Sequence, residues 1–240
     1  MIVTADLHNH SCLSPCGSLE NSPSNLCRRA REQGITMLGL TDHNSARNCP
    51  AFARSCAREG IIPIFGTETT TREELHVLSL FATVAEALDW GDWVYERLPD
   101  YRHDPEKFGD QVVVDEDENI LDFEERYLIP AIDASLDEVS DETLRRGGLI
   151  IPAHIDRTTT SITSQLGFLP QYEYSALEIT SLPAEIDTRG HTLICDSDAH
   201  FLDDLGTRTF QFDIPEAGAS PFTALAAALS TGAVRLSIAM

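Results

Sequence analysis

Short apolar runs rich in β-forming residues alternate with helical stretches along most of the chain, and this alternation limits the possible folds most strongly. The runs are nearly continuous in apolar residues, which is typical of strands buried on both faces. Such alternation predicts a parallel α/β architecture, either a barrel or an open sheet. The expected strands are Ile2–His8, Met37–Leu40, Ile61–Phe65, Leu75–Phe81, Leu149–Pro152, Ala176–Ile179 and Thr192–Cys195, with weaker ones at Arg208–Ile214 and Ala233–Ile238.

Three helices are expected between these strands. The first has Ser22 as its cap and Pro23 in its first turn, runs to Gln33 and ends at Gly34. The second spans Pro50–Glu59 and is closed by Gly60, and the third spans Phe222–Ser230.

Residues 83–146 contain no clear core strand. The acidic run from Val114 to Asn119 reads as the turn of an exposed hairpin, and helices are expected at Leu121–Ile132 and Leu136–Arg146. We expect a helical and hairpin insertion between the fourth and fifth barrel strands, able to pack over the strand ends as a lid. A plain connection between two strands explains the same residues equally well.

Length and composition fit one globular domain over residues 1–240. No run of 18 apolar residues suggests a membrane span, and the first residues lack the features of a secretory signal. The six cysteines are irregularly spaced, which favours reduced thiols over a disulfide framework. We therefore expect a cytoplasmic protein; the oligomeric state is not predicted.

The net charge of −22, from 39 acidic and 17 basic residues, argues against a broad surface for long nucleic acid. Bound divalent cations would reverse the sign of the potential locally. A small phosphorylated substrate held directly on metal therefore remains compatible with this charge.

Histidines and acids gather at the strand ends. Six of the eight histidines lie at or next to the end of an expected strand, the edge where parallel α/β folds place their ligands. Taken singly, His8-x-His10, Glu68 or His154 each has an ordinary structural explanation, and a lone His76 inside an apolar run is more often a core residue. Taken together, imidazoles and carboxylates at six strand ends suit Zn²⁺, Mn²⁺ or Fe²⁺, in a cluster of two or three ions.

These residues resemble the motifs of the PHP (polymerase and histidinol phosphatase) family of metal-dependent phosphoesterases. The motifs occur in family order over nearly the whole chain: Asp6-Leu7-His8-Asn9-His10-Ser11, Thr41-Asp42-His43-Asn44, Gly66-Thr67-Glu68, Leu75-His76-Val77, Pro152-Ala153-His154 and Ser197-Asp198-Ala199-His200. The resemblance implies a distorted (β/α)7 barrel with two or three divalent metal ions at its mouth.

The resemblance also implies a ligand assignment. The first metal would take His8, His10, Glu68 and Asp198, and Glu68 would bridge to a second metal held by His76 and His154. A third would take His43 and His200. The remaining family ligand, Asp or His, falls here at Pro15 and Cys16, so Cys16 is the candidate, with a structural thiol as its alternative.

The function implied is hydrolysis of a small phosphorylated substrate, such as a nucleotide or sugar phosphate, by a metal-activated water. His43 or His200 could protonate the leaving oxygen. Arg157 is the first candidate for binding phosphate, with a surface ion pair as its alternative, and Arg208 is the second. Phe168 or Tyr172 could stack on a substrate ring. Two other functions remain open: a 3'–5' exonuclease and a non-catalytic, metal-stabilised binding module.

Overall fold

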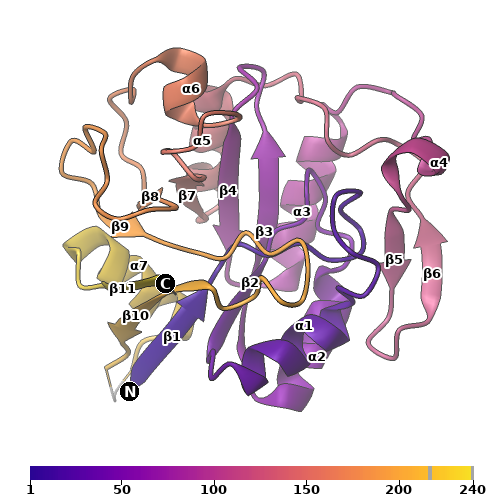
Figure 1. Ribbon diagram of the computed structural model, residues 1–240, viewed down its shortest axis with the longest axis horizontal. Helices are drawn as coiled ribbons and strands as arrows, with labels where there is room; N and C mark the ends of the chain where they lie inside the picture. The colour runs from indigo at the N-terminus through magenta and orange to yellow at the C-terminus, as the bar shows by residue number, and fades with distance from the viewer. Residues whose placement is uncertain (216–217, 239–240) are drawn as a thin grey trace.

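A curled, seven-stranded mixed sheet dominates the computed structural model, which describes residues 1–215 and 218–238 (Figure 1). It forms a half-barrel, and its strand order is β11-β10-β1-β2-β3-β4-β7. Its strands are β1 (Ile2–Asp6), β2 (Met37–Leu40), β3 (Ile62–Thr70), β4 (His76–Phe81), β7 (Leu149–Pro152), β10 (Arg208–Asp213) and β11 (Arg235–Ile238). A separate parallel pair, β8 (Leu177–Glu178) and β9 (Leu193–Ile194), lies beside β7.

The sheet is not all parallel, which corrects the prediction of a parallel architecture. Strands β1, β2 and β3 run parallel, but β4 is antiparallel to both β3 and β7, and β10 is antiparallel to β1 and β11. Only Thr71–Leu75 connect β3 to β4. A parallel crossover needs a dozen or more residues, so this short connection permits only a hairpin.

The two faces of the sheet are covered differently. One face packs on α1 (Pro23–Glu32), α2 (Cys49–Glu59), α3 (Val84–Tyr95) and α5 (Leu136–Arg145). The other face encloses a second apolar cluster together with α7 (Pro221–Thr231). As expected, the Ser22 side chain caps α1, and α2 ends at Gly60, whose φ of 71° is easily adopted by glycine. Along the described residues, no helix has the length and apolar character needed to cross a membrane.

Residues 83–146 hold two helices that pack on the sheet and a hairpin that does not. Helix α3 was not anticipated; it begins with a capping box between Thr83 and Glu86 and packs against β3 and β4. Helix α5 packs against β4 and β7. Between them lie the short α4 (Pro105–Phe108) and the hairpin of β5 (Val112–Val114) and β6 (Ile120–Phe123). A lid role for this region stays a prediction.

The predicted helix at Leu121–Ile132 is wrong, because Ile120–Phe123 pairs with Val112–Val114 and the chain that follows is irregular. The acidic turn is at the predicted place, but ion pairs hold it against the helices. Glu116 contacts Arg54, Asp117 contacts Arg58, and the Ser22 hydroxyl donates to Glu118. These contacts fix the hairpin beside α1 and α2 (Figure 1).

Candidate metal centre

One edge of the sheet carries every histidine and carboxylate of the predicted ligand set. His8 and His10 follow β1, His43 follows β2, Glu68 lies near the end of β3, and His154 follows β7. His76 is the first residue of β4, and the reversal of that strand pairs it with Thr70 at the end of β3. Asp198 and His200 follow β9 and complete the centre. The His10 N–H donates to the Ala199 carbonyl and the Ala199 N–H donates to the His8 carbonyl, which helps to hold this segment in place.

The first group of donor atoms joins His8, His10, Glu68 and Asp198, all buried. The Nε2 atoms of His8 and His10 are 3.2 Å apart, and they lie 3.3 and 3.1 Å from Oδ1 of Asp198. Both Nε2 atoms also lie 3.3 Å from an oxygen of Glu68. Four donors around an ion at tetrahedral Zn–N distances would be separated by about 3.3 Å, so this group fits a metal ion.

Glu68 is the centre of the whole arrangement. Its Oε1 lies 2.7 Å from Nδ1 of His76 and 3.0 Å from Nε2 of His154. Its Oε2 lies 3.2 Å from Nδ1 of His43, and these donors of His43, Glu68 and His76 form a second candidate group. A carboxylate with donors at both oxygens has the arrangement expected of a bridging ligand.

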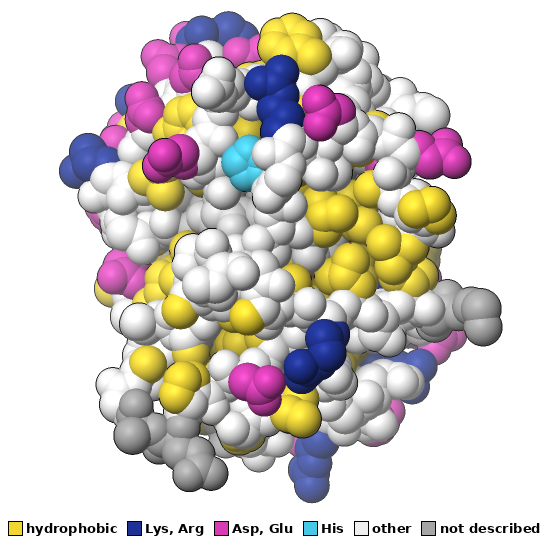
Figure 2. All heavy atoms as spheres, turned by 90° about the vertical axis from the view of Figure 1, so that its left-hand side faces the viewer, with side chains coloured by type: hydrophobic (Ala, Val, Ile, Leu, Met, Phe, Trp, Pro, Cys, Tyr) yellow, Lys and Arg dark blue, Asp and Glu magenta, His cyan; other side chains and the backbone are white. Residues whose placement is uncertain are grey.

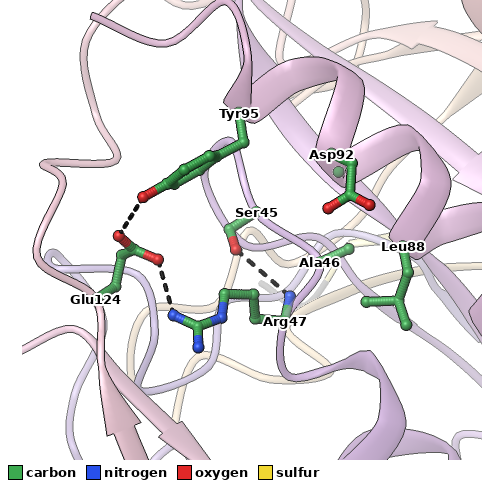
Figure 3. A pocket seen from close by; sticks show the side chains of 8 residues that line it. Ser45, Ala46, Arg47, Leu88, Asp92, Tyr95 and Glu124 are labelled. Carbon is green, nitrogen blue, oxygen red and sulfur yellow. Dashed lines mark hydrogen bonds and ion pairs between the residues drawn. The ribbon is translucent and has the colours of Figure 1, made fainter. Parts of the chain in front are cut away.

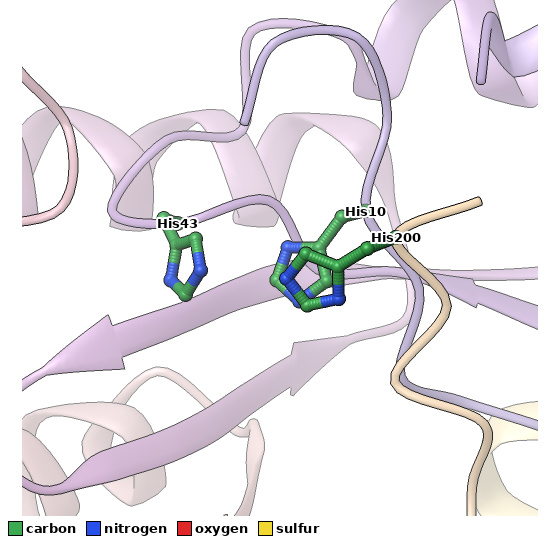
Figure 4. Close-up of side chains that lie close together, drawn as sticks. All are labelled: His10, His43 and His200. Atoms are coloured by element: carbon green, nitrogen blue, oxygen red, sulfur yellow. The ribbon is translucent and has the colours of Figure 1, made fainter. Parts of the chain in front are cut away.

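A third group consists of His10, His43 and His200 (Figure 4). The ring of His10 is close to both others, with centroids 4.5 Å from His43 and 4.3 Å from His200, while His43 and His200 are 6.3 Å apart. His10 is therefore the third member of this candidate group, and a ligand role for Cys16 stays a prediction. Over the described residues, Cys16 joins none of the three groups, and the residue as a whole is exposed. Partial burial and then the charges of Glu68 and Asp198 raise its pKa to about 12.

A buried acid that the sequence did not reveal supports the ligands from behind. Glu178 in β8 places its two oxygens 3.1 and 3.0 Å from Nδ1 of His8, and it accepts a 2.9 Å hydrogen bond from the backbone N–H of His154. A carboxylate behind a ligating imidazole fixes the ring and its tautomer. Its position within a short apolar strand gave no sign of this role.

Asp42 supports the centre through serines rather than by direct contact with an imidazole. It accepts 2.7 Å hydrogen bonds from the hydroxyls of Ser11 and Ser14. The Ser14 oxygen in turn lies 3.1 Å from Nδ1 of His10. Asp42 thus reaches His10 through one intervening side chain.

The buried carboxylates of the centre and the imidazoles around them fit a bound cation. Although burial opposes ionisation, the surrounding imidazoles hold the pKa values of Glu68 and Asp198 well below their ordinary range. Burial lowers the pKa of both His43 and His200, and it keeps them in the neutral form that binds metals. Nδ1 of His43 and of His154 are buried and, within the described chain, have no hydrogen-bond partner. Buried carboxylates beside the neutral imidazoles of His43 and His200, together with these buried ring nitrogens, fit divalent metal ions.

Arg157 lies at the edge of the centre, as the sequence suggested. Its Nη1 is 2.6 Å from Oδ2 of Asp198, and 36% of its side chain is exposed. Arg208 does not share this position, since its guanidinium donates to the carbonyls of Asp196 and Ser197 and so braces the backbone before Asp198. Tyr172 donates its hydroxyl to Asp141 on α5.

A separate cavity of about 280 Å³ lies beyond the His43 segment (Figure 3). It is bounded by Ser45–Arg47, α3 and Glu124. The carboxylate of Glu124 bonds both Arg47 and the Tyr95 hydroxyl. None of the grouped metal-ligand candidates lines this cavity.

Comparison with solved structures reveals the same fold in several proteins. A lesion-specific endonuclease, EndoQ, from Pyrococcus furiosus is 18% identical, with a TM-score of 0.69; the alignment covers 98% of this chain and 58% of the endonuclease. A two-domain protein of Bacteroides vulgatus containing a predicted PHP-like metal-dependent phosphoesterase is 14% identical, with a TM-score of 0.58, covering 100% and 65% of the two chains. An amidohydrolase from Chromobacterium violaceum, with bound sulfate and no metal, is 19% identical, with a TM-score of 0.53, covering 88% and 92%.

This chain therefore spans little more than half the length of the endonuclease that it resembles. Among curated proteins, none matches its sequence. The profile of the PHP domain family matches residues 6–129, just over half of the chain, and these residues contain five of the proposed metal ligands. The motifs, the fold and this match together show that the chain belongs to the PHP domain family.

Proposed function

We propose that this protein is a metal-dependent phosphoesterase that hydrolyses a small phosphorylated substrate. The observation that supports this most is the continuous set of donor groups around Glu68, with the cation of Arg157 at its edge. Two or three divalent ions, of Zn, Mn or Fe, would be held by His8, His10, His43, Glu68, His76, His154, Asp198 and His200. When bound, they would activate water and offset the charge on the phosphate.

The chain's own groups have distinct parts in this reaction. Arg157 presents a guanidinium, whose planar set of donors matches the oxygens of a phosphate. Asp198 holds that guanidinium beside the centre until a phosphate competes for it. His200 has 26% of its side chain exposed, which makes it the histidine of its group best placed to hand a proton to a leaving oxygen at the mouth.

A small substrate is favoured over a long polyanion. The net charge is −22, and the face in Figure 2 carries isolated basic side chains rather than a continuous basic track. The likeness to a lesion-specific endonuclease gives a second candidate, a nuclease acting on nucleic-acid ends or lesions. Bound sulfate in the similar amidohydrolase agrees with a tetrahedral anion as ligand.

Metal analysis combined with a substrate panel tests the proposal. The purified protein should contain two or three divalent ions per chain and should hydrolyse phosphomonoesters faster than short oligonucleotides. Glu68→Gln should lose both metal and turnover, because Glu68 contacts donors of every group. His191→Ala, which removes a histidine outside the centre, is the matched control and should retain both.

Three results would change the conclusion. Preferential cleavage of oligonucleotides would favour the nuclease. Less than one metal per chain with no turnover would favour a non-catalytic binding module. Full activity in Glu68→Gln would refute the bridged centre.

A further inference from the structure

We propose that His103, Phe108 and Tyr127, here called the ring cluster, form a subsite for a planar ring of the substrate beside the metal centre. The inference rests on the proposed function and narrows it. The substrate would be a phosphate ester that carries an aromatic group, of which a nucleotide is the simplest example.

The three rings form one compact group. Tyr127 lies nearly parallel to both other rings, with centroids 4.6 Å from Phe108 and 5.6 Å from His103 and interplanar angles of 22°. The backbone holds them in place: the N–H of His103 donates to Glu125, and the N–H of Tyr127 donates to Tyr101. The short helix α4 folds Phe108 back, and Nε2 of His103 bonds the carbonyl of Gly109 at 2.5 Å.

Both segments that carry the rings are attached to loops bearing metal ligands. A Cβ at Gly109 would lie 3.3 Å from the carbonyl of Pro15, in the turn that follows His10. The residue after Tyr127, Leu128, accepts a 2.6 Å hydrogen bond from Asn44, the neighbour of His43. The two segments that carry the ring cluster therefore lie against the loops that contain His10 and His43.

The ring cluster has no role in either large core. Over the described residues, Phe108 and Tyr127 belong to neither main hydrophobic cluster, and Phe108 remains 44% exposed. A rigidly held aromatic ring that is partly open to solvent, as Phe108 is, is suited to stacking with a planar group.

A pair of substrates that differ only in the ring tests the subsite. AMP and ribose 5-phosphate share their phosphate and sugar, so the ratio of their kcat/KM values isolates the contribution of the base. Phe108→Ala should raise KM for AMP about 10-fold, the expected loss of one stacked base, and leave ribose 5-phosphate unchanged. Phe108→Tyr should keep the wild-type ratio, because it keeps the ring.

Leu144→Ala is the matched control, since Leu144 is exposed to a similar extent, 41%, but lies on α5. It should leave both substrates unchanged. An equal loss for the two substrates in Phe108→Ala, no loss for either, or a selective loss in Leu144→Ala would each overturn the ring subsite.

Failure of the proposed function would look different, because the wild-type protein would then hydrolyse neither substrate. In that case, calorimetric titration with adenosine tests the ring cluster without any chemistry. Binding that is lost in Phe108→Ala supports the subsite, and absent or unchanged binding overturns it.

Discussion

Oε2 of Glu178 lies 3.0 Å from Nδ1 of His8, and both side chains are buried. The same carboxylate accepts a hydrogen bond from the backbone of His154, so one acid positions ligands from two strands. Glu178→Ala should weaken metal affinity by about 10- to 100-fold, the usual cost of losing such a partner. Glu178→Gln should lose less, because an amide oxygen can still accept a hydrogen bond.

Competition with a metal chelator would measure these affinities. Glu185→Ala removes an exposed acid and should leave affinity unchanged. If Glu178→Ala bound metal as tightly as the wild-type protein, Glu178 would have no positioning role.

The pH dependence of the metal-free protein should reflect His10. Burial alone would lower its pKa, but hydrogen bonds to Asp198 and Glu68 raise it from 6.5 to about 9. The contribution of His10 to the free energy of unfolding is therefore fully present below pH 6.5, and it is lost as the pH rises to 9. The Tm of the metal-free protein should therefore fall across this interval.

Metal binding must displace the same proton, so Zn²⁺ affinity should rise over the interval in which metal-free stability falls. Calorimetry and chelator competition at a series of pH values measure the two trends. The metal-free His10→Gln variant should show a weaker fall in Tm, and an equally steep fall there would rule out His10 as its source.

Substitution of Cys16 tests which side chains form the third candidate group. Since His10, His43 and His200 already come together, Cys16→Ala should retain the metal content of the wild-type protein. His200→Ala should lose one ion per chain if this group is occupied. Plasma emission spectrometry of both variants gives the counts, and a lost ion in Cys16→Ala would instead establish a thiolate ligand.

Stability should increase with salt. Acidic residues outnumber basic ones by 39 to 17, so repulsion among like charges outweighs the weak surface ion pairs, such as Arg58–Asp117. Raising NaCl from about 0.01 to 0.15 M shortens the screening length from about 30 to 8 Å and should raise the Tm. Equal osmolarities of a neutral sugar control for solvent effects, and a Tm that falls with NaCl would show that ion pairs dominate.

Much of this fold could be predicted from local sequence. The apolar runs of β2 and β7 end at the predicted residues, and the resemblance to the PHP family is confirmed by the match over residues 6–129. Strand direction was harder, because apolar runs carry no sign of orientation. The orientation of β4 could have been predicted from the length of its connection to β3, because five residues are too few for a parallel crossover.

The predicted helix at Leu121–Ile132 failed because pairing with Val112–Val114 outweighs local preference. The candidate ligands could be proposed from the sequence because each lies in a recognisable motif. Glu178 could not, since its role depends on a neighbour 170 positions away. Its β8 strand comprises only two residues and has no motif of its own.

The reversal of β4 has a consequence for how the centre assembles during folding. Glu68 and His76 are eight positions apart on one hairpin, whereas His10 and Asp198 are separated by 188 positions. Closing the short loop costs much less chain entropy than closing the long one, so the hairpin half of the centre can form early and locally. A cation held by both His10 and Asp198 would link two distant parts of the chain. As the protein unfolds, this cation would be released before the contact between Glu68 and His76 is lost.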